Sequence, residues 1–445
     1  MESKTPAWGI EPVPDRLRVL GFTDTFLLWL NLGISLLVLV LPAYFDLPLG
    51  KALLATLVGG LIGNAMLAVA GLIGADARVP TMVLQRAPLG QQGSYLATGL
   101  NVLQCFGWAI FELIVIATAA GLLSQKVFGF EARWAWTLLF GGVATVLAFL
   151  GPIGFVRRYV RKLAIWAVVA SLAYLTWWIL HGARGASVWS SKGHHGSFWA
   201  AVDIVIAVTV SWAPLVADYT RFSRDRRSAF WGVGLGYLLP TFFQFGFGSV
   251  LVLSREIDPN RPELILTAIA GGGLAAALAL LALTVDETDE AFANVYSAAV
   301  SLQNFLPRAS QRVLIGISAA LATVGALAIN LRSYQSFLGL LGSFFVPLLG
   351  VLIAHWLVNG AHYTADDVFR SPAVRPFEVA AWLVGFGLYQ WLAPYGPSWW
   401  TNLWSGTHAA PIHFSASLPS FAAAFGLALL AGLLGRRARP VLARA

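Results

Sequence analysis

Apolar runs of about 20 residues recur along this chain from Gly21 almost to the C-terminus. Each run is long enough to cross the hydrocarbon core of a bilayer as a helix, in which every backbone N–H and C=O finds its partner internally. Only 11% of the residues are Asp, Glu, Lys or Arg, against about 25% in an average soluble protein. The sequence therefore predicts an all-α integral membrane protein. It excludes a soluble enzyme, a secreted disulfide scaffold and a disordered chain.

Windows of about 20 residues predict twelve transmembrane helices. They cover 22–45, 50–74, 92–123, 134–151, 160–181, 199–217, 228–253, 274–305, 311–330, 334–358, 376–394 and 418–435. The apolar segment 262–273 is shorter and is closed by three glycines. We expect it to be an external hairpin that dips toward the core, and a separate spanning helix is the alternative.

Twelve spans place both termini on one side of the membrane, and most of the 29 Lys and Arg residues fall on that side. The positive-inside rule then predicts cytoplasmic termini for a multi-pass protein of the inner (plasma) membrane. The net charge of +8 reflects this topology, so we expect no nucleic-acid partner, and no obligate protein partner is evident. The polar first 20 residues predict a retained first helix and no cleaved leader.

Two of the predicted spans are interrupted at their middles. The first span carries Asn31, Gly33 and Ser35 at its centre, and the sixth carries Ser211 and Pro214. Proline removes a backbone donor and clashes with the preceding turn. Interrupted helices at matching positions of two halves indicate an inverted repeat, with a substrate and ion site near the midplane.

The two breaks lie five helices apart, which predicts a five-plus-five inverted repeat followed by two C-terminal helices. The expected organisation is a cytoplasmic N-terminal segment (1–21), a first repeat (22–181), an inverted second repeat (199–358), helices 11 and 12 (376–435) and a basic cytoplasmic tail (436–445).

The third span carries a polar stripe of Asn101, Gln104, Trp108 and Glu112, whose spacings place them on one helix face. An indole face, an amide and a carboxylate together suit a planar heterocycle with ring nitrogens and exocyclic N–H groups. The alternative is that the amides join neighbouring helices. Glu112 could also pair with a cation or another helix.

The eighth span contains four acids within five residues: Asp286, Glu287, Asp289 and Glu290. Acids inside a membrane are costly and usually functional. Thr288 and Asp289 are candidate ligands for a hard cation, which prefers oxygen donors. The alternative is that the span ends near residue 285 and the acids lie in a solvated loop.

The chain contains no Walker loop, no CxxC, no HExxH and no GxSxG motif. The sequence thus favours a transporter without cofactors over an ATPase or a membrane hydrolase.

Five stretches of the chain match a known pattern: WGIEPVP at 8–14, LIGN at 61–64, LNVLQ at 100–104 with Gly107-Trp108, ADYTRF at 217–222 and ANVYS at 293–297. On these motifs the chain resembles the nucleobase–cation symporter-1 family, and within it most closely the branch of hydroxymethylpyrimidine transporters. The resemblance implies twelve helices with the leucine-transporter-type inverted repeat. It also implies a planar base stacked between aromatic residues of helices 3 and 6 and hydrogen-bonded by helices 1, 3, 6 and 8.

The resemblance also implies a set of substrate-binding residues. Trp108 matches the helix 3 aromatic residue, and Gln104 and Glu112 flank it by one turn. The position that aligns with the helix 6 aromatic residue is Thr209, whereas the nearby aromatic residue is Trp212. The remaining implied residues are Ser35 at the first break, Ser211 at the second break and Asn294 on helix 8.

For the ion, the resemblance places Val285, Thr288 and Asp289 on the sodium positions of the family. Asn31 and Ile34 would supply helix 1 carbonyls. Sodium-coupled members carry a hydroxyl residue where this chain has Asp289. The coupling ion is therefore expected to be Na⁺, with H⁺ carried by Asp289 as the alternative.

The expected function is secondary active symport of a pyrimidine-type heterocycle, either hydroxymethylpyrimidine or a cytosine-like nucleobase, with a cation. Three alternatives remain: a purine, hydantoin or allantoin transporter of the same family, an amino-acid permease of the same fold, and a channel or receptor.

Overall fold

The computed structural model describes residues 9–155, 165–182, 196–257, 264–329, 334–405, 407 and 414–437. The regular elements among these residues are helices joined by turns and loops, with no strand. The helices of the first half are α1 (Phe22–Leu32), α2 (Leu36–Val40), the 3₁₀ turn η2 (Leu41–Tyr44), α3 (Leu49–Ala77), α4 (Thr81–Leu84), α5 (Arg86–Leu89), α6 (Gly93–Phe128), α7 (Arg133–Phe155) and α8 (Ile165–Gly182). Those of the second half are α9 (Phe198–Val210), α10 (Val216–Thr220), α11 (Arg226–Arg255), α12 (Leu264–Gly271), α13 (Leu274–Asp286), α14 (Thr288–Phe305), α15 (Gln311–Ala328) and α16 (Tyr334–Val358). The C-terminal part holds α17 (Ala365–Phe369), α18 (Pro376–Leu392), α19 (Ser398–Ser405) and α20 (Ser417–Arg437).

The prediction of an all-α membrane protein is confirmed. Within the described residues, seven helices are long and apolar enough to cross a membrane, namely α3, α6, α7, α11, α15, α16 and α20. The pair α1 and α2 adds an eighth span, bent by 50° at its break. The four other predicted spans correspond to α8, to α9 with α10, to α13 with α14, and to α18.

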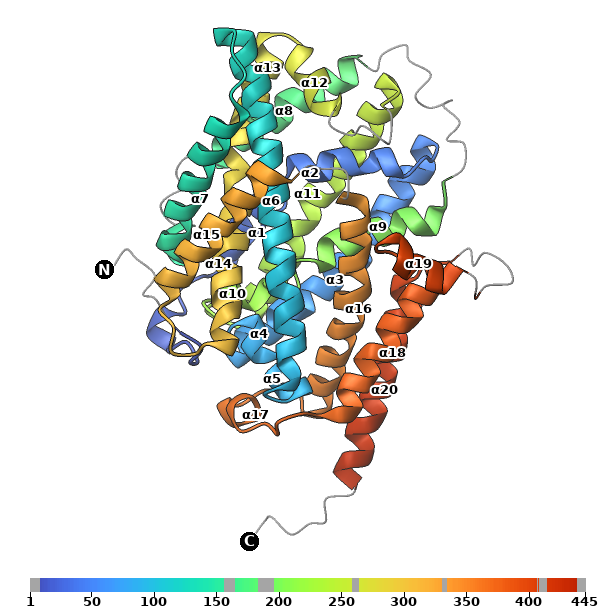
Figure 1. Ribbon diagram of the computed structural model, residues 1–445. Helices are drawn as coiled ribbons and strands as arrows, with labels where there is room; N and C mark the ends of the chain where they lie inside the picture. The colour runs from blue at the N-terminus through green and yellow to red at the C-terminus, as the bar shows by residue number, and fades with distance from the viewer. Residues whose placement is uncertain are drawn as a thin grey trace.

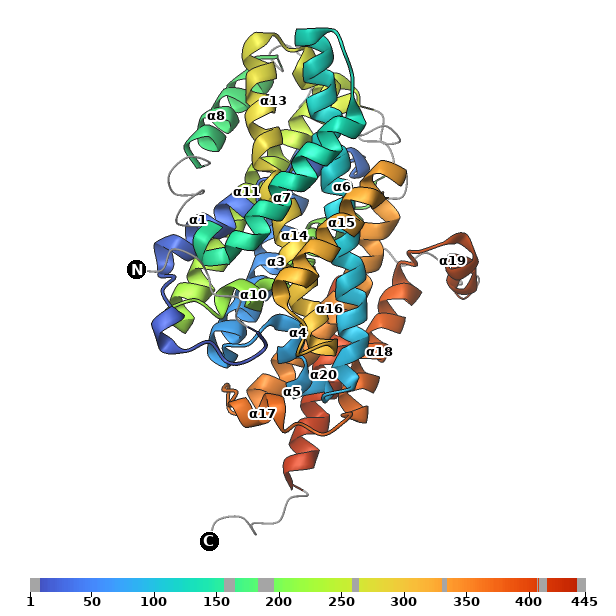
Figure 2. The same ribbon diagram turned by 60° about the vertical axis from the view of Figure 1, so that its left-hand side comes forward.

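The helices form an elongated bundle in which α6 runs along most of the long dimension (Figure 1). The C-terminal helices α18 and α20 pack against each other and against α16 on one side of the bundle (Figures 1 and 2). On the opposite side, α14 packs against α6, α7 and α15. Of the two broken spans, α1–α2 packs mainly on α11, and α9–α10 packs mainly on α3.

Both predicted breaks are confirmed. The first span stops at Leu32 and restarts at Leu36, and Ser35 has extended dihedral angles, φ −135° and ψ 137°. The sixth span passes through turns at 211–215 before α10 begins. Small residues let the second broken span approach α3 closely: a Cβ on Gly63 would lie 2.9 Å from the Thr209 Cβ.

The eighth predicted span is not one continuous helix. It divides at Glu287, where α13 ends and α14 begins. The alternative of a solvated loop is wrong, because Asp286, Glu287, Asp289 and Glu290 are at most 5% exposed. Backbone hydrogen bonds continue through this junction, since the Glu287 N–H donates to the Leu283 carbonyl and the Glu290 N–H to the Glu287 carbonyl.

The segment 262–273 contains the short helix α12, and residues 262–263 lie outside the described residues. Its eight residues span about 12 Å, which is too short to cross a membrane, so the alternative of a separate spanning helix is wrong. The predictions for residues 1–8, 160–164 and 438–445 also fall outside the described part of the chain.

Candidate substrate and ion site

A cavity of about 330 Å³ lies between the two broken spans. Its walls come from α2, α6, α11, α14 and the end of α9 with the following turns. The lining residues are Ser35, Val38, Trp108, Glu112, Val208, Ser211, Trp212, Leu215, Tyr237, Glu290 and Asn294. Six of the eight substrate-binding residues expected from the sequence are therefore brought together here, and Gln104 and Thr209 are not among them.

Two indoles line this cavity, one from α6 and one from the turn that follows α9. Trp108 on α6 contacts Phe337 edge-on, with ring centroids 5.7 Å apart. Trp212, in the turn after α9, contacts Trp29 edge-on at 5.7 Å and Tyr237 at 6.1 Å. Because rings on either side fix the two indoles, the cavity offers flat aromatic surfaces whose orientation is set before a ligand enters.

The polar wall of the cavity is formed by Glu112, Glu290 and Asn294. The Asn294 side-chain amide donates to both carboxylate oxygens of Glu112, at 3.0 and 3.3 Å, and to the backbone carbonyl of Glu290 at 3.1 Å. The side chains of Glu112 and Glu290 line the same cavity. A ligand in this cavity thus meets aromatic faces on its flat sides and two carboxyls on one edge.

The other members of the helix 3 stripe join helices. The Gln104 amide donates to the Ser211 carbonyl at 2.8 Å, and the Asn101 amide donates to the Ser301 hydroxyl at 2.9 Å. The helix-joining interpretation therefore describes these two residues, whereas Trp108 and Glu112 line the cavity. Thr209 points elsewhere, since its hydroxyl donates to the Val205 carbonyl on its own helix.

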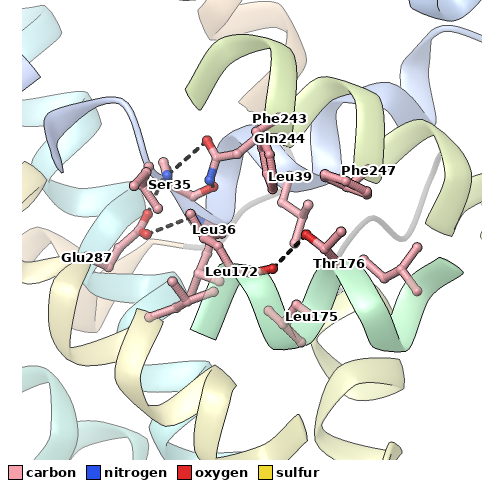
Figure 3. A pocket seen from close by; sticks show the side chains of 13 residues that line it. Ser35, Leu36, Leu39, Leu172, Leu175, Thr176, Phe243, Gln244, Phe247 and Glu287 are labelled. Atoms are coloured by element: carbon pink, nitrogen blue, oxygen red, sulfur yellow. Dashed lines mark hydrogen bonds between the residues drawn. The ribbon is translucent and has the colours of Figure 1, made fainter. Parts of the chain in front are cut away.

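The backbone at the first break is stabilised by two side chains from other helices, Glu287 and Gln244 (Figure 3). The Glu287 carboxylate accepts from the Leu36 backbone N–H at 2.7 Å and from the Ser35 hydroxyl at 2.8 Å. Gln244 on α11 pairs with the Ser35 backbone in both directions, accepting from its N–H at 3.1 Å and donating to its carbonyl at 2.8 Å. These contacts satisfy the backbone groups that the break leaves without helical partners.

The end of α1 meets the same run of acids. The Asn31 amide donates to the Asp289 carboxylate, and to the Asp286 carboxylate at 3.3 Å. The Thr288 hydroxyl donates to the Val285 carbonyl at 2.6 Å. Of the five residues expected at the ion site, Asn31 and Asp289 are therefore in direct contact, and Thr288 lies beside Val285.

Ile34, the remaining expected ion-site residue, is buried within the break itself. It lines a second, largely apolar pocket beside α8, α11 and α13, together with Ser35, Gln244 and Glu287 (Figure 3). The Asn31 carbonyl accepts a backbone hydrogen bond from Ile34 at 3.1 Å. The side chain of Asn31 thus contacts the acids, and its carbonyl accepts a hydrogen bond within the break.

Five buried carboxyls gather around the cavity and the first break: Glu112, Asp286, Glu287, Asp289 and Glu290. Among the described residues, none of them forms an ion pair with Lys, Arg or His. One oxygen of Asp286 and one of Asp289 are buried without a hydrogen-bond partner in the described part of the chain. Because buried, unpaired charges are very unfavourable, the cluster requires protons or bound cations.

The acids are not arranged as a transition-metal centre. Within the described ranges, no group of three or more His, Cys, Asp or Glu side chains converges as metal ligands do. Single acids beside hydroxyl and backbone oxygens suit an alkali cation or a proton better than a multivalent metal.

Sequence reasoning noticed the run of acids but did not assign Glu287 to the first break or Glu290 to the cavity. Gln244 and Tyr237 were missed altogether. Gln244 could have been recognised as a contact between helices, because an amide within the apolar seventh span needs a hydrogen-bond partner. No feature of the sequence indicated that Tyr237 lines the cavity.

A model of the family described as "Permease for cytosine/purines, uracil, thiamine, allantoin" matches residues 12–385. The cytosine permease of Escherichia coli (strain K12) is 24% identical over 341 residues, which are 76% of this chain and 78% of that protein. The allantoin permease of Bacillus subtilis (strain 168) is 24% identical over 353 residues, 72% of this chain and 71% of that protein.

Solved transporter structures share the fold. Mhp1, a nucleobase–cation symport-1 family transporter in a closed conformation with bromovinylhydantoin bound, has a TM-score of 0.75 at 18% identity and covers 98% of this chain and 96% of its own. A Na⁺-coupled sialic acid symporter has a TM-score of 0.60 at 12% identity, covering 95% and 90%. The leucine-transporter-type fold implied by the family resemblance is thereby confirmed.

Proposed function

The chain belongs to the nucleobase–cation symporter-1 family of permeases, and from that premise we propose that it imports a pyrimidine-type heterocycle together with a cation. The substrate is hydroxymethylpyrimidine or a cytosine-like base. The cavity between the broken spans carries this proposal, because its two indoles and its carboxyl edge suit an aminopyrimidine. Transport proceeds by alternating access, as in other transporters with interrupted helices.

In this proposal the ring of the substrate lies between Trp108 and Trp212. Glu112 accepts from an exocyclic amino group, and Asn294, Ser211 and Ser35 contact the rest of the edge. Gln104 fixes the carbonyl of Ser211 from behind. Thr209 supports the close approach of α9 to α3 and does not touch the substrate.

The coupling ion is Na⁺, held by the backbone carbonyls of Asn31, Ile34 and Val285 and by the side chains of Thr288 and Asp289. H⁺ bound to Asp289 is the alternative. The unpartnered carboxylate oxygens near the end of α1 support a cation at this place. Ion binding would hold α1 against α14, and because Ser35 lines the cavity, it would also complete the substrate site. Binding of the ion then raises the affinity for the substrate, and binding of the substrate raises the affinity for the ion by the same factor, because the two sites share these helices.

The topology follows the same proposal. Residues 22–181 and 199–358 form the two inverted repeats, 376–435 add two helices, and 1–21 and 436–445 lie in the cytoplasm of a cell whose plasma (inner) membrane holds the protein. The excess of basic residues on the side of the termini supports this orientation.

Thermal shift of the purified protein tests substrate and ion together. The panel contains hydroxymethylpyrimidine, cytosine, uracil, purines, hydantoin, allantoin and amino acids, each in sodium and in choline buffer. We expect stabilisation by an aminopyrimidine that is larger in sodium. A pH dependence without a sodium dependence would assign the proton instead. Stabilisation by amino acids alone would contradict the proposal.

A further inference from the structure

We propose that an arginine-rich pocket beside the starts of α1 and α11 binds a phosphate group. The group is carried either by a soluble phosphate monoester or by the headgroup of an anionic phospholipid. The pocket has a volume of about 970 Å³ and shares no lining residue with the substrate cavity. A ligand here goes beyond the proposed function and does not depend on which base is transported.

The pocket lies where four segments of the chain meet at one end of the bundle. They are the segment before α1, the end of α3, the start of α11 and the residues at the start of α17. Leu20 forms a β-bridge with Ser223, and its carbonyl accepts from the Arg224 backbone N–H at 2.8 Å. A ligand that contacts these segments ties them together, so binding should raise the melting temperature.

The lining of the pocket carries an excess of positive charge. Its Arg and Asp residues are Arg18, Arg78, Arg224, Arg226, Asp76 and Asp225. Four positive charges therefore stand against two negative ones. A phosphate monoester carries about −1.5 to −2 charges at pH 7, which matches this excess.

Both acids of the pocket are already engaged by the protein. The Asp76 carboxylate accepts from the Trp356 indole N–H at 3.0 Å and forms an ion pair with Arg226. The Asp225 carboxylate accepts from the backbone N–H of Ser228 at 2.8 Å and from its hydroxyl at 2.9 Å. Because these carboxylates already have their partners, the pocket favours an anion over a cation.

Arg18 is fixed in place at the wall of the pocket. Its Nε donates to the Ser223 carbonyl at 3.1 Å, its Nη2 donates to the Ala75 carbonyl at 3.2 Å, and its side chain is only 11% exposed. Burial, and then the neighbouring charge of Arg78, lower the pKa of the Arg18 guanidinium. An anion bound beside the two guanidinium groups would offset this unfavourable environment.

Arg78 and Arg224 are the arginines best able to reach a ligand. Arg78 pairs with Asp15 at 3.0 Å, but the Asp15 side chain is 80% exposed, and ion pairs with exposed partners contribute little. Arg224 is exposed and forms no ion pair among the described residues. Planar guanidinium groups bind phosphate oxygens in pairs, so we expect Arg78 and Arg224 to hold the phosphate against Arg18.

The position of the pocket explains why a lipid is one of its two possible sources of phosphate. The starts of α1 and α11 pack closely, since a Cβ on Gly232 would lie 2.7 Å from the Thr25 Cβ. Beside this contact, Phe22 is 45% exposed and Trp231 is 53% exposed. Exposed aromatic residues at the ends of spans mark the level of the lipid headgroups, and basic pockets at this level bind anionic headgroups.

The experiment records melting curves of the purified full-length protein in two arms. One arm adds glycerol 3-phosphate in detergent, with glycerol and sodium chloride at equal ionic strength as the reference. The other arm compares phosphatidylcholine nanodiscs with and without phosphatidic acid. We expect a higher melting temperature with the phosphate monoester. A shift in the first arm assigns a soluble ester, and a shift in the second arm alone assigns a lipid headgroup.

Two variants and one control test the position of the site. Arg78→Gln and Arg224→Gln should each raise the dissociation constant about tenfold, because each removes hydrogen bonds to a charged group. Arg227→Gln is the matched control, since this exposed arginine stands at the start of α11 but does not line the pocket. It should keep the wild-type response, and a retained response to cytosine shows that each variant is folded.

Absence of a shift with both glycerol 3-phosphate and phosphatidic acid would overturn the proposed phosphate site. Wild-type affinity in both Arg78→Gln and Arg224→Gln would do the same. An equal loss in Arg227→Gln and Arg224→Gln would reduce the effect to non-specific attraction by surface charge and would also overturn it. These outcomes leave the proposed function intact, because binding of bases in the cavity is recorded separately.

Discussion

The two interrupted spans are held open in different ways. At the first break, a carboxylate and an amide from other helices satisfy the backbone: Glu287 accepts from Leu36 and Ser35, and Gln244 pairs with Ser35. At the second break, the chain mostly bonds to itself. The N–H groups of Trp212, Ala213 and Leu215 donate to carbonyls three residues earlier.

Two neutral amides from α6 also stabilise the second break: Gln104 donates to the Ser211 carbonyl, and Asn101 donates to the Pro214 carbonyl at 3.4 Å. The second break therefore contains no ionisable group and is built as a fixed support for Trp212. The first break depends on a cluster of acids, and a cation or proton that binds there changes its hydrogen bonding. Under the proposed function, this difference means that the ion would act on the first span, whereas the second span would provide a constant wall of the cavity.

The largest effect is expected for Glu287→Ala. The substitution leaves the Leu36 N–H and the Ser35 hydroxyl without an acceptor, at about 1–3 kcal/mol for each buried group. We expect a clearly lower melting temperature in detergent and loss of uptake into proteoliposomes. Glu287→Gln keeps an acceptor and should fall between this variant and the wild type. An unchanged melting temperature for Glu287→Ala would show that the carboxylate does not hold the break.

Asp289→Asn should remove the response of the first break to the ion. Coupling free energies between two sites are about 1–3 kcal/mol, so the ratio of substrate affinities in sodium and in choline should fall toward one. Titrations at several pH values, run in parallel, show whether a proton dependence disappears instead.

Asp203→Asn is the control for this measurement. Asp203 is buried, but it accepts from Ser415, Ala416 and Ser417 at the start of α20, away from the first break. This variant should keep the sodium dependence even if it is less stable. A sodium dependence that survives in Asp289→Asn would place the ion elsewhere.

Gln104→Ala probes the second break and should have a smaller effect. It removes the hydrogen bonds from the Gln104 amide to the Ser211 carbonyl and to the Asn101 side chain, each worth about 0.5–1.5 kcal/mol, while the turn retains its own bonds. We expect weaker substrate binding with an unchanged sodium-to-choline ratio in the same titrations. A changed ratio would contradict the division of roles between the two breaks.

The smallest effect is expected where an acid starts a helix outside the membrane. Asp225 accepts from the Ser228 N–H at 2.8 Å at the start of α11, as Glu287 does from Leu36 at the start of α2. Water can replace this cap, so Asp225→Ala should reduce the free energy of unfolding by only about 1 kcal/mol. Chemical denaturation of the two proteins side by side measures the difference.

The pH dependence of this cap has a definite sign. The hydrogen bond from the Ser228 backbone lowers the pKa of Asp225 below its ordinary value. The carboxylate therefore contributes fully above the unfolded-state pKa of about 3.9, and its contribution is lost as the pH falls through the lower folded-state pKa. The difference between Asp225→Ala and the wild type should accordingly shrink in acid. A pH-independent difference would mean that the charge of Asp225 plays no part.

Several parts of the site could be predicted from local sequence. Gly33 and Pro214 mark the two breaks because they weaken helices wherever they stand. Trp108 and Glu112 were recognised because an indole and a carboxylate four residues apart share a helix face. The helix 6 aromatic position was harder, because Thr209 and Trp212 are less than one turn apart, and a break changes the register between them.

The sequence by itself determined the membrane class, the approximate spans and the presence of costly acids, because hydropathy and helix-breaking residues act locally. Only the tertiary structure decided which acid serves which partner. Glu287 reaches Ser35 across 252 residues of sequence, and Asn294 reaches Glu112 across 182. Such pairings depend on how distant helices pack and rotate against one another, and the pattern of a single helix does not contain that information.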